Sequence, residues 1–471
     1  MTSSDSNRAS AHDASPGAPA GAPRSASAAP LITPRRTLAG AFILAGLILR
    51  IAQIAGLELA GGAADSRALN PVGYALWLGA LLLWPDLPRG SRRQAGALAG
   101  VGIVLLVTAW LVFDARIHWL NLPNGNANVV AMLVGVSFIG LIGGLRTQPR
   151  SPGRAVTGRR GLLGTLLGVH LLGSILNLST LFMIGDRLAR RGPLTAPQLL
   201  ALNRGFCSAA LWSPFFAAMA VVMGLAPQLS YIQVLGHGLA LALCAGLLTM
   251  IEIPRRFDLS DTPGFSMSPR SLLMPVVMAG LVMFFHYRLT PSLPILAIIT
   301  FLLPGIAVLL NLAKGLDWTA SRLRRHTQER LPAMRGEVSL FLCAGLLTQG
   351  LTALANAATD GGWRLFADFG PAEASMSFAA IVASSLVGLH PIIGISVLAS
   401  VIGLASASQQ TLFALACLAA WGVGTSVGPI SGTNLSLQGR YGASGGLIMR
   451  NNLGYAAVMS VLVIISLWLP G

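Results

Sequence analysis

Apolar runs about as long as a bilayer is thick recur from residue 37 to the end of the chain. Of all residues, 54% are hydrophobic and only 10% are charged. A helix needs about 20 mostly apolar residues to cross the hydrocarbon core, and only structures that satisfy their own backbone hydrogen bonds survive there. The sequence therefore predicts an all-α polytopic membrane protein with the lipid bilayer as its solvent.

The net charge of +16 is distributed as the positive-inside rule expects. Arginines cluster in short loops, at 89–93, 146–160 and 314–335. We expect these loops and the N-terminus to be cytoplasmic, the protein to lie in the plasma membrane, and nucleic acid not to be a partner. Residues 1–36 are rich in Ser, Ala, Gly and Pro, a composition that predicts a disordered cytoplasmic tail.

Two stretches of the chain share the same landmarks in the same order. These are Asn177, Gly192-Pro193 and Ser213-Pro214 in the first, and Asn356, Gly370-Pro371 and His390-Pro391 in the second. Asn to Gly takes 15 residues in the first (177 to 192) and 14 in the second (356 to 370). Self-similarity indicates two copies of one unit, and transporters often bind their substrate where the broken helices of such units meet.

The apolar run 161–185 has arginines on both flanks. A plain span is the simplest interpretation, but it would place basic residues on both sides of the membrane. A re-entrant hairpin that turns near Asn177 and leaves on the side where it entered agrees with the charge rule. We therefore predict a hairpin here, with its turn buried in protein or lining a cavity.

Residues 196–226 and 372–405 are each too long for one straight span, and each contains an internal proline, Pro214 or Pro391. Proline removes a backbone donor and clashes with the preceding turn. A simple kink would explain either segment alone. The repeat favours discontinuous helices, with free carbonyls before each proline and a positive helix N-terminus after it.

The loop after Asn356 is acidic, whereas the matching loop of the first copy is rich in arginine. Opposite charge on matching loops predicts opposite sides of the membrane, and hence two inverted repeats. The span count leaves this open. Four crossings are predicted between the copies and inversion needs an odd number, so either one was missed or 337–355 itself crosses.

The expected organisation has six parts. They are a disordered tail (1–36), N-terminal scaffold helices (37–145), repeat 1 with its hairpin and broken helix (146–252), scaffold helices with a basic cytoplasmic loop (253–336), repeat 2 (337–427), and a polar Gly-rich stretch with the last span (428–471).

The sixteen acidic residues fall in the tail, in loops or at predicted span ends. Proton-driven cation antiporters usually hold a carboxylate at mid-membrane, so this distribution argues against that class. Hydroxyls, amides and helix N-termini suit an anion, whereas carbonyls and hydroxyls suit sodium. Arg204 is expected at the membrane interface, and the four cysteines as buried apolar residues.

The candidate substrate- or ion-binding residues lie at the two predicted turns and breaks: Asn177, Ser179, Thr180, Ser213, Pro214, Asn356, Thr359, His390 and Pro391. His390 can be a packing residue or a proton carrier. A second set comes from the polar stretch near 428–436, which can also be a plain loop: Thr425, Ser426, Ser431, Thr433 and Asn434. Neither a cofactor nor a metal site is expected, apart from a possible sodium ion.

This layout resembles the ion transporter superfamily, which includes the divalent-anion/sodium symporters and the large membrane subunit of TRAP transporters. Asn177 with Ser179-Thr180 resembles the first hairpin tip of the symporters, and Ser213-Pro214 resembles the first break. Asn356 with Thr359, and His390-Pro391, occupy the second positions. The resemblance implies a homodimer and an elevator movement of the hairpin domain.

The leading hypothesis is a secondary active transporter of a small anionic substrate, such as a carboxylate. Sodium is favoured over protons as the coupling ion, because only one break carries a titratable group. A cation/proton antiporter or a metalloid exporter of the same superfamily is the alternative. An integral membrane transferase is a distant one, because the internal loops are short and basic. We expect the protein not to be an enzyme.

Overall fold

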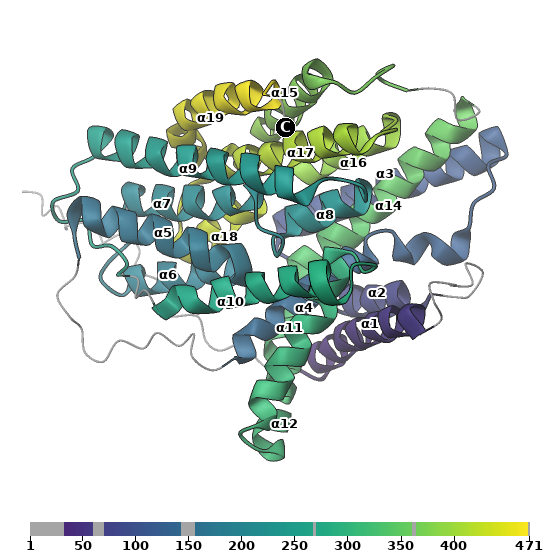
Figure 1. Ribbon diagram of the computed structural model, residues 1–471, viewed down its shortest axis with the longest axis horizontal. Helices are drawn as coiled ribbons and strands as arrows, with labels where there is room; N and C mark the ends of the chain where they lie inside the picture. The colour runs from purple at the N-terminus through teal and green to yellow at the C-terminus, as the bar shows by residue number, and fades with distance from the viewer. Residues whose placement is uncertain (1–32, 60–69, 143–155, 267–269, 360–363, 470–471) are drawn as a thin grey trace, which may run out of the picture.

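The computed structural model describes residues 33–59, 70–142, 156–266, 270–359 and 364–469. Within these ranges the chain is helical, apart from one isolated antiparallel pairing of Thr157 with Pro263 (Figure 1). Eight of the described helical segments are long and apolar enough to cross a membrane: Pro34–Gly56, Arg89–Phe113, Trp119–Leu141, Tyr231–Arg256, Ile295–Leu312, Arg335–Ala358, Ala407–Tyr441 and Gly445–Leu467. The predicted class of helical membrane protein is thereby confirmed.

The first helices form one side of the molecule. They are α1 (Pro34–Leu59), α2 (Pro71–Leu83), α3 (Arg89–Phe113) and α4 (Ala127–Ser137), with short turns η1 (Trp84–Asp86), η2 (Trp119–Asn124) and η3 (Phe138–Leu141). α1 starts at Pro34, inside the predicted tail, and residues 1–32 lie outside the described ranges. α3 crosses α14 closely, since a Cβ added to Gly350 would lie 2.5 Å from the carbonyl oxygen of Gly102.

The next unit starts with two helices that meet at Asn177, α5 (Gly158–Leu176) and α6 (Leu178–Ala189). α6 returns along α5, because a Cβ added to Gly168 would lie 3.4 Å from Ile184 Cδ1. α7 (Ala196–Ser208) continues through the turn η4 (Ala209–Leu211), stops, and resumes as α8 (Ala217–Leu225). The long helix α9 (Tyr231–Arg256) completes the unit.

A connecting group of helices follows. It consists of α10 (Arg270–Phe284), η5 (Phe285–Leu289), α11 (Ile295–Leu312), α12 (Leu316–Arg325), the π-helical turn η6 (His326–Arg330), α13 (Leu331–Ala333) and α14 (Arg335–Ala358). α12 projects from the lower side of the molecule in Figure 1.

The predicted turn at Asn356 is wrong. α14 runs without interruption through 24 residues, and Asn356 is an exposed residue in its last turn. The segment from 337 is therefore a helix long enough to cross the membrane, the second of the two alternatives left open by the span count. The C-terminal end of α14 lies far from α5 and α6 in Figure 1.

The last unit consists of α15 (Pro371–Leu386), α16 (Pro391–Val401), α17 (Ala407–Val427), α18 (Gly432–Tyr441) and α19 (Gly445–Leu467). α17 lies at the centre of the fold and contacts α7, α8, α9, α15 and α19. Most of the combined α17–α18 segment is buried. Its aromatic residue Trp421 stacks on Phe341 of α14, with ring centroids 6.1 Å apart.

Candidate functional site

The turn at Asn177 and the break at Ser213-Pro214 lie against each other. Asn177 Nδ2 donates a hydrogen bond to the carbonyl oxygen of Phe215 at 3.0 Å, and Ser213 Oγ donates to the carbonyl oxygen of Ser174. The amide of Phe215 donates to Ser213 Oγ at 3.2 Å. The structure thus brings together Asn177, Ser213 and Pro214, which the sequence placed 36 residues apart (177 to 213) or more.

The local sequence explains both interruptions. Asn177 has φ 51° and ψ −144°, a conformation that side chains other than glycine rarely adopt, and Asn tolerates positive φ better than most residues. Pro214 has no amide hydrogen and its ring clashes with the preceding turn, which favours an interruption at this point. Thr180 follows in the first turn of α6, where its buried Oγ1 has no hydrogen-bond partner among the described residues.

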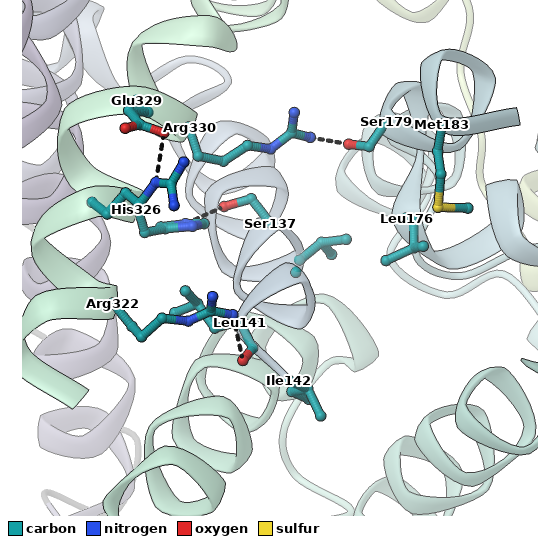
Figure 2. A pocket seen from close by; sticks show the side chains of 13 residues that line it. Ser137, Leu141, Ile142, Leu176, Ser179, Met183, Arg322, His326, Glu329 and Arg330 are labelled. Carbon is teal, nitrogen blue, oxygen red and sulfur yellow. Dashed lines mark hydrogen bonds and ion pairs between the residues drawn. The ribbon is translucent and has the colours of Figure 1, made fainter. Parts of the chain in front are cut away.

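A cavity of about 420 Å³ opens beside this turn (Figure 2). Leu176, Ser179 and Met183 line it from α5 and α6. The opposite side is formed by one face of the α12–η6 segment: Arg322, Arg325, His326, Glu329 and Arg330. Arg330 donates to Ser179 Oγ across the cavity, so a predicted site residue is in contact with the basic segment.

The three arginines that line the cavity have different partners. Arg325 forms an ion pair with Glu329 at 2.9 Å. Arg322 makes a long hydrogen bond to the carbonyl oxygen of Leu141, at 3.4 Å, and its guanidinium lies 5.9 Å from the ring centroid of Trp318. Its buried Nε has no hydrogen-bond partner in the described part of the chain. Arg322, Arg325 and Arg330 thus each make one hydrogen bond to a described residue, and that of Arg322 is the longest.

His326 is a neutral group between these arginines. Its Nε2 lies 3.0 Å from Ser137 Oγ, which itself donates to the carbonyl oxygen of Val134 at 2.6 Å, so the ring nitrogen is the donor. Burial, together with the positive charges of Arg330 and Arg322, lowers the pKa of His326 to about 3. The positive charge of this wall therefore comes from guanidinium groups alone at neutral pH.

The His390-Pro391 break lies at a junction between two helices, as predicted. α15 ends at Leu386, and His390 is the N-cap of α16, where its Nδ1 accepts a hydrogen bond from the amide of Ile392 at 3.2 Å. The buried ring packs edge-on against Trp421, with centroids 5.1 Å apart. His390 does not line the cavity beside Asn177.

A third break separates α17 from α18 and contains the second set of candidate residues. Asn434 Nδ2 donates to the carbonyl oxygen of Gly428 at 2.8 Å, and Ser431 Oγ donates to that of Thr425 at 2.7 Å. Asn203 of α7 donates to Asn434 Oδ1 at 2.7 Å. The stretch that was predicted as either a site or a loop is thus a helix break. α18 follows it, and Thr433 in the first turn of α18 is buried.

Two predicted residues lie away from these breaks. Asn356 is exposed at the end of α14, and Thr359 Oγ1 donates to the carbonyl oxygen of Ala355 at 2.7 Å, as a helical threonine often does. α14 contains no turn at this point, so neither residue occupies the position that was predicted from Asn177.

The position of Arg204 also differs from the prediction. Its side chain is fully buried among other helices, whereas a snorkelling arginine would expose its guanidinium. It pairs with Glu252 at 2.8 Å, donates to Asn452 Oδ1 at 2.7 Å, and lies over the ring of Tyr455. This network connects α7 to α9 and α19, and a preceding asparagine, Asn203, joins it to the α17–α18 break.

Comparison with solved structures finds distant similarity. The fold is similar to the crystal structure of the YdaH transporter from Alcanivorax borkumensis, with a TM-score of 0.39 and 15% identity, covering 91% of this chain and 98% of that one. No protein-family model and no curated protein matches the sequence.

Proposed function

We propose that the chain is a secondary active transporter that moves a small anion across a membrane by alternating access. The observation that carries this proposal is the cavity beside Asn177, where arginine side chains and a serine hydroxyl meet at a helix break. Guanidinium groups bind carboxylates and other oxyanions through charge-assisted hydrogen bonds. The described residues include eight apolar helices of spanning length, and in such a protein this cavity suits a passing anion better than a fixed structural charge.

Two units of matching order support the alternating-access part of the proposal. α5–α9 and α15–α19 each comprise a helix pair, a helix interrupted before a proline, and a long last helix. The distance from the first junction to the interrupting proline is 37 residues in one (177 to 214) and 39 in the other (390 to 429). α5 packs on α7 as α15 packs on α17.

We therefore propose that the internal repeat pairs these two units, that they are inverted in the membrane, and that each opening helix pair is a re-entrant hairpin. In this pairing His390-Pro391 corresponds to the Asn177 turn, and Gly428-Pro429 corresponds to Ser213-Pro214. The C-terminal stretch 428–471 then belongs to the second repeat, and α14 belongs to the scaffold.

Sodium is the proposed coupling ion. Thr180 Oγ1 is buried and lacks a partner among the described residues, and no described donor reaches Asn177 Oδ1, so oxygen ligands are available at the first break. His390 is less suited to carry a proton, because protonation of Nδ1 would break its bond to the Ile392 amide.

The proposed orientation follows the positive-inside rule. The N-terminus and the basic α12–η6 segment are cytoplasmic, and the membrane is the plasma membrane. The superfamily resemblance supports a homodimer in which the α5–α9 and α15–α19 units move against the remaining helices.

Reconstitution into proteoliposomes tests the proposal. Uptake of a labelled carboxylate should depend on an imposed sodium gradient and be inhibited by other organic anions. Arg322→Gln should lower uptake roughly 10- to 100-fold at low substrate concentration, since hydrogen bonds to charged groups contribute about 1.5–3 kcal/mol.

Arg324→Gln provides the matched control, because it removes the same charge from the same helix at an exposed position outside the cavity lining. Equal loss in both variants, or cation–proton exchange in place of anion uptake, would contradict the proposal.

A further inference from the structure

The side chain of Arg330 crosses the cavity beside Asn177 (Figure 2). It extends from the end of η6 and donates a hydrogen bond to Ser179 Oγ in the first turn of α6. The two elements pack mainly on other neighbours, since α6 packs on α5 and α7, whereas η6 packs on α1, α12 and α13. The Arg330–Ser179 contact therefore joins two walls that lie on opposite sides of the cavity.

The wall that carries Arg330 is held by helices outside the α5–α9 unit. His326 Nε2 lies 3.0 Å from Ser137 Oγ of α4. A Cβ added to Gly40 of α1 would lie 1.9 Å from the carbonyl oxygen of Thr327, so the two backbones touch at this point. Packing this close leaves η6 little freedom to shift, and Arg330 is presented from a fixed position.

The wall that carries Ser179 is held within the α5–α9 unit itself. Asn177 Nδ2 donates to the carbonyl oxygen of Phe215 at 3.0 Å, and the amide of Thr180 donates to the carbonyl oxygen of Asn177 at 3.0 Å. Both bonds are kept if the unit moves as one body. The Arg330–Ser179 contact is broken by such a movement, because its donor belongs to the other group of helices.

We propose that the Arg330–Ser179 contact holds the α5–α6 turn in the empty cavity, and that an incoming oxyanion releases the turn by taking Arg330 from Ser179. This inference rests on the proposed function, because it describes the regulation of the same site. A hydroxyl oxygen is neutral, whereas an oxyanion adds ion pairing and can accept two guanidinium hydrogen bonds at once. Exchange of the partner is therefore favourable, and it couples anion binding to release of the turn.

The affinity of the anion distinguishes this arrangement from one in which Ser179 binds the substrate. In Ser179→Ala the anion no longer competes with a hydroxyl for Arg330. Its affinity should therefore rise by roughly 2- to 10-fold, the equivalent of one hydrogen bond. Removal of a serine that bound the substrate would lower the affinity instead.

Hydrogen exchange of the full-length protein in detergent, without added oxyanion, tests the contact in the empty cavity. Exchange of the segment 174–183 should be roughly 2- to 10-fold faster in Ser179→Ala and in Arg330→Met than in the wild type. The double variant should exchange no faster than either single variant, because both substitutions break the same bond. Ser179→Thr keeps the hydroxyl and should exchange as the wild type does.

Ser321→Ala and Arg324→Met are the matched controls. Both residues are exposed on α12 and lie outside the cavity lining, so neither substitution should change exchange of the segment 174–183. Gel filtration of every variant reports folding. Wild-type exchange in folded Ser179→Ala and Arg330→Met, or effects that add in the double variant, would overturn the inference.

Calorimetry with butanoate, succinate and inorganic sulfate tests the release by an anion. Any of the three that binds the wild type should bind Ser179→Ala more tightly and should speed exchange of the segment 174–183 in the wild type. Binding that Ser179→Ala weakens or leaves unchanged would overturn the inference, even where the exchange results agree with it.

Transport in proteoliposomes separates this inference from the proposed function. Sodium-driven anion uptake by a protein whose turn exchanges equally in the wild type and in Ser179→Ala would support the transporter and reject the Arg330–Ser179 contact as its control. Faster exchange in both single variants of a protein that binds none of the three anions would reject release by an anion together with the anion transporter.

Discussion

Replacing Asn177 probes the turn between α5 and α6 most directly. Asn177→Ala removes the donor to the carbonyl oxygen of Phe215, a residue that is 1% exposed, while the backbone keeps its positive φ of 51°. An unsatisfied buried carbonyl costs about 1–3 kcal/mol. The pair φ 51°, ψ −144° lies in a sparsely populated region that costs a residue with a Cβ about 1–3 kcal/mol.

The lost hydrogen bond and the positive φ predict different stabilities for the Ala and Gly variants of residue 177. Asn177→Ala should lower the free energy of unfolding by about 1–3 kcal/mol, because it loses the hydrogen bond while the positive φ strains both side chains alike. Asn177→Gly loses the same hydrogen bond but has no Cβ in the strained conformation, so it should be more stable than the Ala variant by about 1–3 kcal/mol. Thermal unfolding in detergent should therefore place the midpoint of the Ala variant below those of the Gly variant and the wild type.

Asn356→Ala is the matched control. The same side chain is removed, but from the exposed last turn of α14, so the midpoint should remain within error of the wild type. Equal midpoints for the Ala and Gly variants of residue 177 would show that the positive φ carries no cost. An equal loss of stability from Asn356→Ala would show that the two asparagines have equivalent roles. It would refute the assignment of the buried turn to Asn177 and of an exposed helix end to Asn356.

Two further outcomes are expected. The pKa of His326 is about 3 in the folded state and about 6.5 in the unfolded state, so the unfolded chain binds the proton first as the pH falls. The contribution of His326 to the free energy of unfolding is therefore fully present above about pH 6.5. It decreases by about 1.4 kcal/mol per pH unit toward pH 3. Thermal midpoints from pH 7 to 4 should show a shallower slope in His326→Gln, and an unchanged slope would exclude this group. Arg204→Met leaves Glu252 with its ion pair to Arg256 but removes the buried hydrogen bond to Asn452, and it should cost about 1–3 kcal/mol. Glu329→Gln breaks an exposed pair and should cost at most about 1 kcal/mol, and thermal unfolding measures both.

Local chemistry predicted the helix interruptions well. The arginines on both sides of 161–185 indicated a turn, and the structure interrupts this segment at Asn177. The prolines of the two long segments lie at junctions between helices, because a proline cannot continue the hydrogen-bond ladder. Both signals act within a few residues, which is why a single sequence is enough to read them.

The position of the second copy could not be read in the same way. Asn356 matched Asn177 by letter and spacing, but in a chain with 54 Gly and 27 Pro such spacing arises by coincidence. The loop after Asn356 carries Asp360, Asp368 and Glu373 against Arg364, whereas arginines follow Asn177, and that difference was the usable signal. The Gly428-Pro429 pair, with Ser431 and Asn434 after it, was the better match to a helix break.

The cavity depended on tertiary contacts. Ser179 and Arg330 are 151 residues apart, and nothing near either of them predicts their contact. The basic segment itself contained a signal, because Arg322, His326 and Arg330 recur every four residues and so share one face of a helix. The sequence was interpreted only as a cytoplasmic charge cluster, so the side chains that line the cavity from this segment were not predicted.

The glycine crossing of α3 and α14 has a mechanical consequence. With the backbones of Gly102 and Gly350 in contact, neither helix can slide or roll past the other without separating, and even one methyl group at either position would force them apart. The two helices therefore move as one rigid unit. Any displacement of the cavity-forming helices must therefore occur at the connections to this unit, and not by sliding of α3 along α14.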